Sequence, residues 1–127
     1  RLTMQVTFTD PAVATLGSSE KECQALDTPY LVACYPFGDH GKAMCLGETH
    51  GCVKLICRPR TGELIGAHIV GPEAGELIQT AVMALRAGMT VQDIADELFP
   101  YLTMVEGLKL CAQTFTKDVK QLSCCAG

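Results

Sequence analysis

Short stretches in which apolar and polar residues alternate predict β-strands in the first half of the chain. The alternation over residues 5–9 ends at an Asp-Pro pair, and residues 31–35 show the same pattern. The clearest element is a hairpin, because residues 52–58 and 63–70 are apolar, β-branched runs on either side of a Pro-Arg-Thr-Gly turn. Residues 36–49 are rich in glycine and charge, and they predict a loop or an irregular strand.

The second half of the chain changes to the spacing of amphipathic helices. Apolar residues recur every three or four positions between Pro72 and Gly88, which predicts a helix with Pro72 near its first position and Gly88 just past its end. A shorter helix start is predicted upstream, over residues 17–22, with Ser18 or Ser19 as N-cap. The apolar stripe of the longer helix consists of Ala74, Leu77, Ile78, Ala81 and Leu85.

Two further helices are predicted towards the C-terminus. One starts at Thr90 and stops before Pro100, and the other opens at a capping-box sequence formed by Thr103 and Glu106. The apolar face of the last helix would consist of Met104, Leu108, Cys111 and Phe115, so Cys111 is predicted to be a core residue. Together these elements predict an α+β fold, an antiparallel sheet of three to five strands with helices packed on one side.

The length and the charge of the chain exclude some classes of function. The 127 residues form one predicted domain, and the Arg-Leu-Thr-Met start reads as the middle of a longer protein. The net charge of −4 comes without a basic stripe, which argues against nucleic-acid binding. No apolar run approaches the ~20 residues that span a membrane, and no signal peptide is recognisable, so no membrane partner is expected.

Eight cysteines stand at positions that follow no disulfide-framework or zinc-site spacing, which predicts a reduced, cytoplasmic protein. Cys52 and Cys57 have the CxxxxC spacing of a redox-active disulfide. On a strand, however, residues an odd number apart point to opposite faces, and five residues span about 16 Å, so these sulfurs are predicted not to meet. The full set is Cys23, Cys34, Cys45, Cys52, Cys57, Cys111, Cys124 and Cys125.

The adjacent cysteines Cys124 and Cys125 carry the most specific chemistry. A disulfide between neighbouring residues is strained, whereas two thiolates side by side on a chain end can hold one thiophilic metal ion and pass it on by ligand exchange. The alternative for an isolated pair is two spare thiols on a frayed tail. Both interpretations stay open on the residues alone.

No complete active site is visible in the sequence. There is no dinucleotide fingerprint after a strand, and Gly66, Gly71 and Gly75 fit hairpin and helix-start positions better than a phosphate cradle. His40 and His50 fall in the predicted loop. His68 falls on a predicted strand, where a packed or edge histidine is a better interpretation than a catalytic base.

Six segments of the chain carry recognisable motifs: residues 9–17, 51–55, 66–71, 74–78, 98–110 and 117–127. Together they resemble a known family, the C-terminal dimerisation domain of the flavin- and nicotinamide-dependent disulfide oxidoreductases, which includes glutathione reductase and lipoamide dehydrogenase. The resemblance covers essentially the whole chain. In the last two segments, which include the Cys-Cys-Ala-Gly end, it is to the mercuric reductases of that family.

One departure from the wider family bears on mechanism. Most members carry a His-Pro-Thr-x-Ser-Glu run, in which the histidine is the general acid/base and the glutamate orients it. The matching run here begins at Tyr101 and ends at Glu106. Tyrosine is a poor proton shuttle at neutral pH, which argues against dithiol substrates and is compatible with the reduction of a metal ion. Glu106 has an equal alternative role as the N3 residue of a capping box in which Thr103 is the N-cap.

The resemblance implies a parent enzyme that reduces Hg(II) to elemental mercury with electrons from NADPH through FAD, both bound by domains absent from this chain. It implies a homodimer in which Cys124 and Cys125 deliver Hg(II) to the buried dithiol in the FAD domain of the partner subunit. Tyr101 and Glu106 would act at that inner site. The isolated domain would be inactive.

Two alternatives remain: a dimerisation domain of a lipoamide dehydrogenase-like reductase, and a stand-alone thiol metal-binding module. Residues 35–43 and 66–71 look nearer to lipoamide dehydrogenases than to mercuric reductases. Five cysteines are not family features, and they would either bind mercury unspecifically or be small buried residues. These are Cys23, Cys34, Cys45, Cys52 and Cys57.

Overall fold

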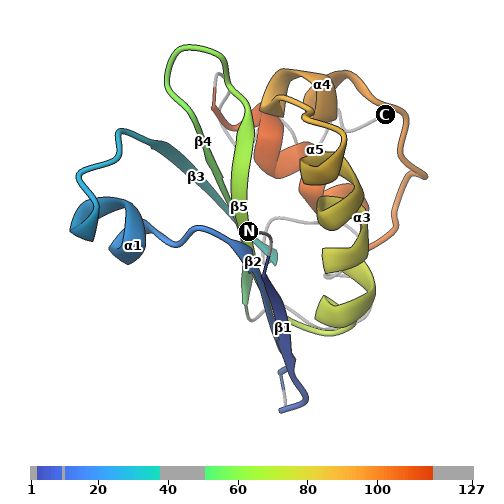
Figure 1. The fold of residues 1–127 in the computed structure, drawn as a ribbon. Helices are drawn as coiled ribbons and strands as arrows, with labels where there is room; N and C mark the ends of the chain where they lie inside the picture. Colours follow the sequence, from blue (N-terminus) through green and yellow to red (C-terminus); the bar gives the residue numbers. More distant parts are fainter. Residues whose placement is uncertain (1–2, 10, 38–50, 116–127) are drawn as a thin grey trace.

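The structure is a computed structural model, and it describes residues 3–9, 11–37 and 51–115. Its centre is a five-stranded antiparallel sheet with the strand order β1-β2-β5-β4-β3 (Figure 1). The strands are β1 Met4–Thr7, β2 Val13–Gly17, β3 Leu31–Pro36, β4 Cys52–Cys57 and β5 Leu64–Val70. The helices are α1 Glu20–Ala25, α3 Ala74–Arg86, α4 Val91–Asp96 and α5 Glu106–Gln113.

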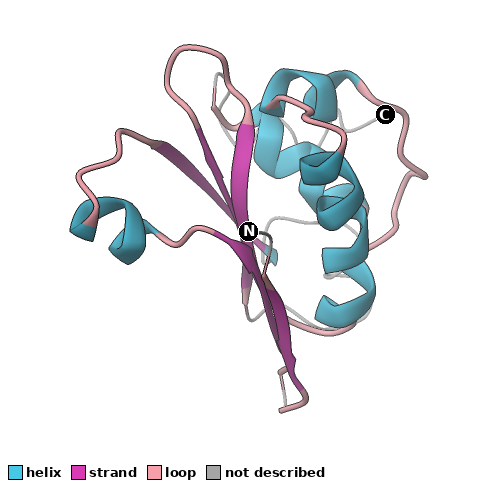
Figure 2. Ribbon diagram, viewed as in Figure 1, coloured by secondary structure: helices cyan, strands magenta, loops and turns pink. Residues whose placement is uncertain are grey.

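The three later helices form one layer against one face of the sheet (Figure 2). In that layer α3 packs on β5 and β2, and α5 packs on β4 and β3. The short helix α1 lies on the other side of the sheet, at the far left of Figure 1. The predicted fold class, an antiparallel α+β sandwich, is confirmed, with α1 as an addition on the opposite face.

Strand alternation separates the two faces. On β4, Val53, Leu55 and Cys57 belong to the buried apolar cluster beneath the helices. Cys52 and Lys54, which alternate with Val53 and Leu55 along the strand, are only half-buried on the open face. The prediction that Cys52 and Cys57 point to opposite faces is therefore confirmed, and both are free thiols.

Two of the helix starts are set by local hydrogen bonds, as predicted. Ser19 caps α1 and Glu22 returns the bond to the Ser19 backbone, which completes a capping box. Thr90 and Asp93 do the same for α4. These reciprocal bonds satisfy backbone N–H groups that a helix start leaves unpaired, so helices of only six residues are held in place.

Helix α3 begins two residues later than predicted. Its N-cap is Glu73, in the left-handed region with φ 60°, so Pro72 precedes the helix instead of occupying its first position. The end is as predicted, because Gly88 follows the C-cap Ala87 with φ 72°. The buried stripe includes Ala84, while Leu85 is only partly buried.

Strand β2 was missed by the sequence pattern, and it sits inside the sheet between β1 and β5. Only two of its residues, Ala14 and Leu16, are fully buried, so its pattern is too short to stand out. The chain leaves β2 in close contact with β5: a Cβ on Gly66 would lie 2.0 Å from the carbonyl oxygen of Ser18. No helix in the described ranges has the length and apolar character to cross a membrane.

Candidate functional site

Tyr101 and Glu106 flank the turn that leads into α5. Tyr101 is 58% exposed, whereas Glu106, the first residue of α5, is 2% exposed. The Oε1 atom of Glu106 accepts a 3.0 Å hydrogen bond from the backbone N–H of Leu102. Leu102 has φ 61°, a left-handed conformation that costs a bulky residue about 1–3 kcal/mol. The buried carboxylate therefore holds the strained residue next to Tyr101.

The capping-box alternative for Glu106 is wrong. The N-cap of α5 is Val105, without a side-chain cap hydrogen bond, and the Thr103 hydroxyl donates to the Pro100 carbonyl at 2.8 Å. The physical reason is a tight turn ahead of the helix, in which the Glu106 N–H reaches the Thr103 carbonyl at 3.3 Å. The regular helix therefore starts two residues later than the Thr103 signal predicts.

The second carboxyl oxygen of Glu106, Oε2, is buried without a hydrogen bond from the described residues. The start of α5 offsets part of this cost, because a helix N-terminus favours negative charge. The arrangement leaves one acceptor available to a group that the described residues do not supply.

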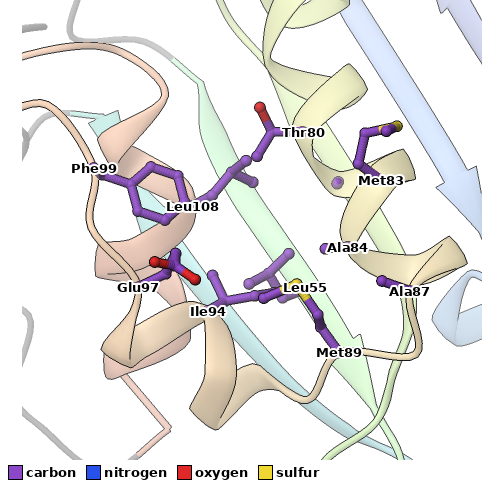
Figure 3. Close-up of a pocket in the computed structure, with 11 residues that line it drawn as sticks. Leu55, Thr80, Met83, Ala84, Ala87, Met89, Ile94, Glu97, Phe99 and Leu108 are labelled. Atoms are coloured by element: carbon purple, nitrogen blue, oxygen red, sulfur yellow. The ribbon is translucent and has the colours of Figure 1, made fainter.

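An apolar groove opens between the helices close to this turn (Figure 3). Its volume is about 360 Å³, with Leu55 of β4 at its floor and Phe99 and Leu108 at one side. Phe99 is two residues from Tyr101, so the groove and the exposed tyrosine belong to neighbouring surfaces. The groove is lined by Leu55, Thr80, Ala81, Met83, Ala84, Ala87, Met89, Ile94, Glu97, Phe99 and Leu108.

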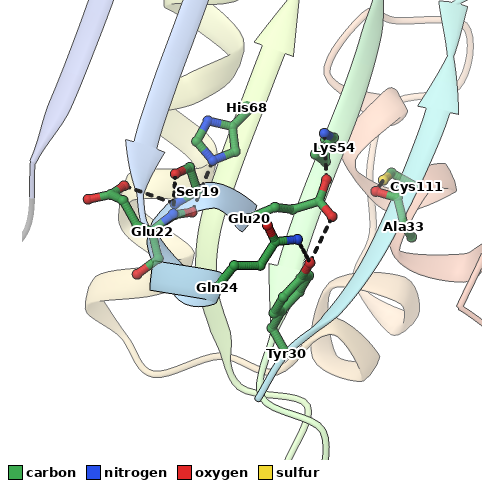
Figure 4. A network of polar contacts seen from close by, with 10 residues as sticks. Ser19, Glu20, Glu22, Gln24, Tyr30, Ala33, Lys54, His68 and Cys111 are labelled. Carbon is green, nitrogen blue, oxygen red and sulfur yellow. Dashed lines mark hydrogen bonds and ion pairs between the residues drawn. The ribbon is translucent and has the colours of Figure 1, made fainter. Parts of the chain in front are cut away.

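The open face of the sheet carries a polar network (Figure 4). Lys54 Nζ lies 2.8 Å from Glu20 Oε2, and the Tyr30 hydroxyl donates to Glu20 Oε1 at 3.1 Å. The Lys54 hydrogen bond holds the pKa of the Glu20 carboxyl below its ordinary value. His68 Nε2 donates to the Ser18 carbonyl at 3.0 Å, which confirms its interpretation as a packed residue.

Cys111 is the thiol buried beneath the helices. Its sulfur donates to the carbonyls of Ala33 and Val53 at 3.4 and 3.3 Å. Burial raises the pKa of this thiol to about 12, so it is unreactive at neutral pH. The prediction that Cys111 is a core residue is confirmed.

Two other thiols meet on the open face. Cys34 is exposed and Cys52 is half-buried, and the pairing of β3 with β4 makes them diagonal neighbours. The neighbouring Cys34 thiol, aided by the Lys54 ammonium and opposed by partial desolvation, lowers the pKa of Cys52 to about 6. The neighbouring Cys52 raises the pKa of Cys34.

Sequence reasoning missed this pair. The period-two pattern puts both cysteines on outward positions, but only the pairing of β3 with β4 brings them together. That pairing joins two strands separated by residues 37–51. A connection of this length does not determine which residues of the two strands face each other.

The predicted metal ligands Cys124 and Cys125 lie outside the described residues, as do Cys45, His40 and His50. Within residues 3–9, 11–37 and 51–115, no group of three or more His, Cys, Asp and Glu side chains could hold a metal ion. The delivery role of the Cys124–Cys125 pair therefore stays a prediction.

Residues 3–112 match the dimerisation domain of the pyridine nucleotide-disulphide oxidoreductases, and the chain belongs to that family. Among named relatives, it is 55% identical over 122 residues to a mercuric reductase of Shewanella putrefaciens and 44% identical to one of Staphylococcus aureus. Each match covers 96% of this chain and 22% of the relative. The predicted resemblance to the dimerisation domain of mercuric reductases is thus confirmed.

Solved structures agree with this assignment. The chain superposes on LpdA of Mycobacterium tuberculosis with a TM-score of 0.84 and 27% identity, over 91% of this chain and 25% of that one. The fold also matches the flavoprotein disulfide reductase RclA of Escherichia coli, with a TM-score of 0.83 and 22% identity over 91% and 26% of the two chains. The chain thus spans about a quarter of these enzymes.

Proposed function

We propose that the chain is the dimerisation and metal-delivery domain of a flavin-dependent mercuric reductase, which reduces Hg(II) to elemental mercury with NADPH in the cytoplasm. The observation that carries the proposal is the outward-facing Tyr101 on a turn braced by buried Glu106. A phenol at this place serves a metal substrate better than a dithiol substrate, which needs a base that titrates near neutral pH. Identity of 55% to a relative named mercuric reductase supports the same substrate.

In this proposal Glu106 is a positioning residue. It does not reach outward itself, since it is 2% exposed, but it holds the Leu102 backbone and with it the direction of the Tyr101 loop. Tyr101 would face the FAD domain of the partner subunit, where its hydroxyl can donate a hydrogen bond beside the bound metal. The unpaired Oε2 of Glu106 would accept from a group of that partner.

The apolar groove would lie at the contact between two copies of the chain. Large apolar side chains stand exposed beside it, with Met83 64% and Leu98 89% accessible to solvent. A patch of this kind favours association, and the family is defined by dimerisation through this domain. Dimerisation would also bring the Tyr101 loop of one copy to the other.

Hg(II) transfer follows from thiol chemistry. Cys124 and Cys125 would bind Hg(II) as two thiolates near the surface. An incoming thiolate of the buried dithiol then forms a new Hg–S bond as one from the tail breaks, and the departing sulfur takes up a proton. Two such exchanges move the ion without releasing it to water.

Two glycines in the described part of the chain, Gly66 and Gly71, do not fit a flavin or nucleotide cradle. A Cβ on Gly66 would meet the Ser18 carbonyl, and one on Gly71 would meet the Phe37 ring at 2.5 Å, so both serve close packing. FAD and NADPH would therefore be bound by other parts of the parent enzyme, where they supply the two electrons. We expect the isolated domain to lack reductase activity.

Metal retention tests the delivery role. The reduced chain is loaded with Hg(II) under a large excess of free cysteine, and the ions retained per chain are counted by native mass spectrometry. Cys124→Ala/Cys125→Ala should lose one Hg(II) relative to the unaltered chain, while Cys23→Ala, at a buried thiol, should lose none. Equal retention by the double variant and the unaltered chain would refute metal delivery and favour the lipoamide dehydrogenase-like alternative.

Self-association tests the groove. Met83→Lys places a charge at the groove edge and should weaken dimerisation at least about tenfold in sedimentation equilibrium. Leu26→Lys is the matched control, because Leu26 is 78% exposed next to α1, on the other side of the sheet. If Leu26→Lys weakened association and Met83→Lys did not, the interface would lie on the open face instead.

A further inference from the structure

The open face of the sheet brings two thiols together by strand register. Cys34 of β3 pairs directly with Lys54 of β4, and Cys52 stands two residues before Lys54 on the same face. Cys34 and Cys52 are therefore diagonal neighbours, a relation in which side chains of adjacent strands reach each other. Both residues are free thiols.

The surroundings select the kind of ion that fits. Zinc sites in proteins need three or four protein ligands, and no third His, Cys, Asp or Glu joins these two in the described part of the chain. Two thiolates alone suit a soft ion of low coordination number, which binds two sulfurs in a line. Cys34 is exposed on the surface, so an ion can enter and the side chain can rotate to the far side of it.

Lys54 makes the site a pre-formed one. Lys54 is the register partner of Cys34 and stands two residues after Cys52, and its ammonium is held 2.8 Å from Glu20, which is itself bonded to Tyr30. A fixed positive charge favours a thiolate next to it before any metal arrives. Cys111, the other sulfur near β3 and β4, is on the covered face and turned towards backbone carbonyls, so it is not a competing ligand.

We propose that Cys34 and Cys52 form a second dithiol site, on the open sheet face, which binds one two-coordinate thiophilic ion such as Hg(II). The site is separate from Cys124 and Cys125 and does not depend on their delivery role. Binding forms two Hg–S bonds and releases to water the protons that the two thiols still carry. The product has no net charge at the sulfurs, which leaves Lys54 paired with Glu20 alone.

The test starts from the full chain with Cys124→Ser/Cys125→Ser, which removes the tail ligands. The protein is reduced, kept without oxygen and loaded with Hg(II) under excess free cysteine, and retained ions are counted by native mass spectrometry. This background should keep one Hg(II) per chain, because two thiols on a rigid face bind with a high effective concentration. Adding Cys34→Ala or Cys52→Ala should remove it, at least a tenfold loss of retention.

Matched controls are Cys23→Ala, at a buried thiol of α1, and Cys45→Ala, and neither should lower retention. Mercury X-ray absorption on the background variant should show two sulfur neighbours. Unchanged retention in Cys34→Ala and Cys52→Ala, or loss in Cys45→Ala instead, would overturn the proposal. Because Cys34 is exposed, its variant folds, and circular dichroism verifies this. The outcome is independent of the tail test, which compares the unaltered chain with its Cys124→Ala/Cys125→Ala variant.

Discussion

On the face of the sheet beneath α3 and α5 the Cys111 thiol is enclosed by apolar residues, whereas on the open face the Cys52 thiol lies beside another thiol and an ammonium. Burial raises the pKa of Cys111 to about 12. The neighbouring Cys34 thiol and Lys54 lower the pKa of Cys52 to about 6. One residue type thus gains opposite reactivity across a single layer of backbone.

The difference shows which physical effect decides thiol chemistry here. Desolvation acts on both residues and disfavours the thiolate in each. At Cys52 it is outweighed by a donor and a cation, while Cys111 has only weak backbone partners to oppose it. Cysteine reactivity in this domain therefore follows from the neighbours that each strand register supplies.

The largest expected effect is in alkylation rate. Because the thiolate is the nucleophile, Cys52 should gain reactivity as pH rises through about 6, while Cys111 stays unmodified up to its pKa of about 12. At pH 7 the rates should differ by on the order of 10³-fold or more. Iodoacetamide labelling of the folded chain, followed by peptide mass mapping, measures each site separately.

Two variants sharpen this result. Cys34→Ala removes the thiol donor and should shift the Cys52 reactivity profile to higher pH, and Lys54→Met should shift it in the same direction by less. Cys23→Ala should leave the profile in place. A Cys52 profile centred near that of an ordinary thiol in the unaltered chain would contradict the contrast between the faces.

A stability difference of intermediate size is expected between adjacent residues of β4. Leu55→Ala removes a side chain that is 0% exposed beneath the helices and should cost about 2–5 kcal/mol of unfolding free energy. Lys54→Ala, one position along on the open face, removes a half-exposed ion pair and should cost less than about 1 kcal/mol. Urea unfolding of both variants measures the difference. Similar losses would mean that the open face carries as much packing energy as the covered one.

Much of the fold could be predicted from the sequence, because many of its elements are specified by local patterns that do not depend on tertiary contacts. The hairpin of β4 and β5 and the caps at Ser19 and Thr90 depend only on residues close along the chain. Strand β2 was missed because it has two inward residues and depends on both neighbours for its pairing. The start of α5 was misplaced because its turn competes with the Thr103 capping signal.

The candidate site was predictable only in part. The Tyr101 and Glu106 pair could be found from the family motif, but the bond that links Glu106 to the Leu102 backbone could not, since the motif implies a different partner. Cys34 and Cys52 are far apart in the chain, and nothing in either segment fixes the register that joins them. The pairing of strands that are distant in the sequence could therefore not be predicted from sequence patterns alone.

The smallest expected effect concerns the ion pair that fixes Lys54. The pKa of Glu20 is depressed by Lys54, so the stability it contributes is complete above its unfolded pKa and is lost as pH falls through its lower folded pKa. Because the two side chains are 35% and 31% exposed, Glu20→Gln should cost at most about 1 kcal/mol at pH 7. Urea unfolding at pH 7 and at acidic pH measures this loss, which should vanish in acid. Glu63→Gln, at the more exposed pair with Arg58, is the control and should change less. A loss that stayed constant into acid would show that Glu20 acts through packing, so the lysine beside the two thiols would lack its electrostatic anchor.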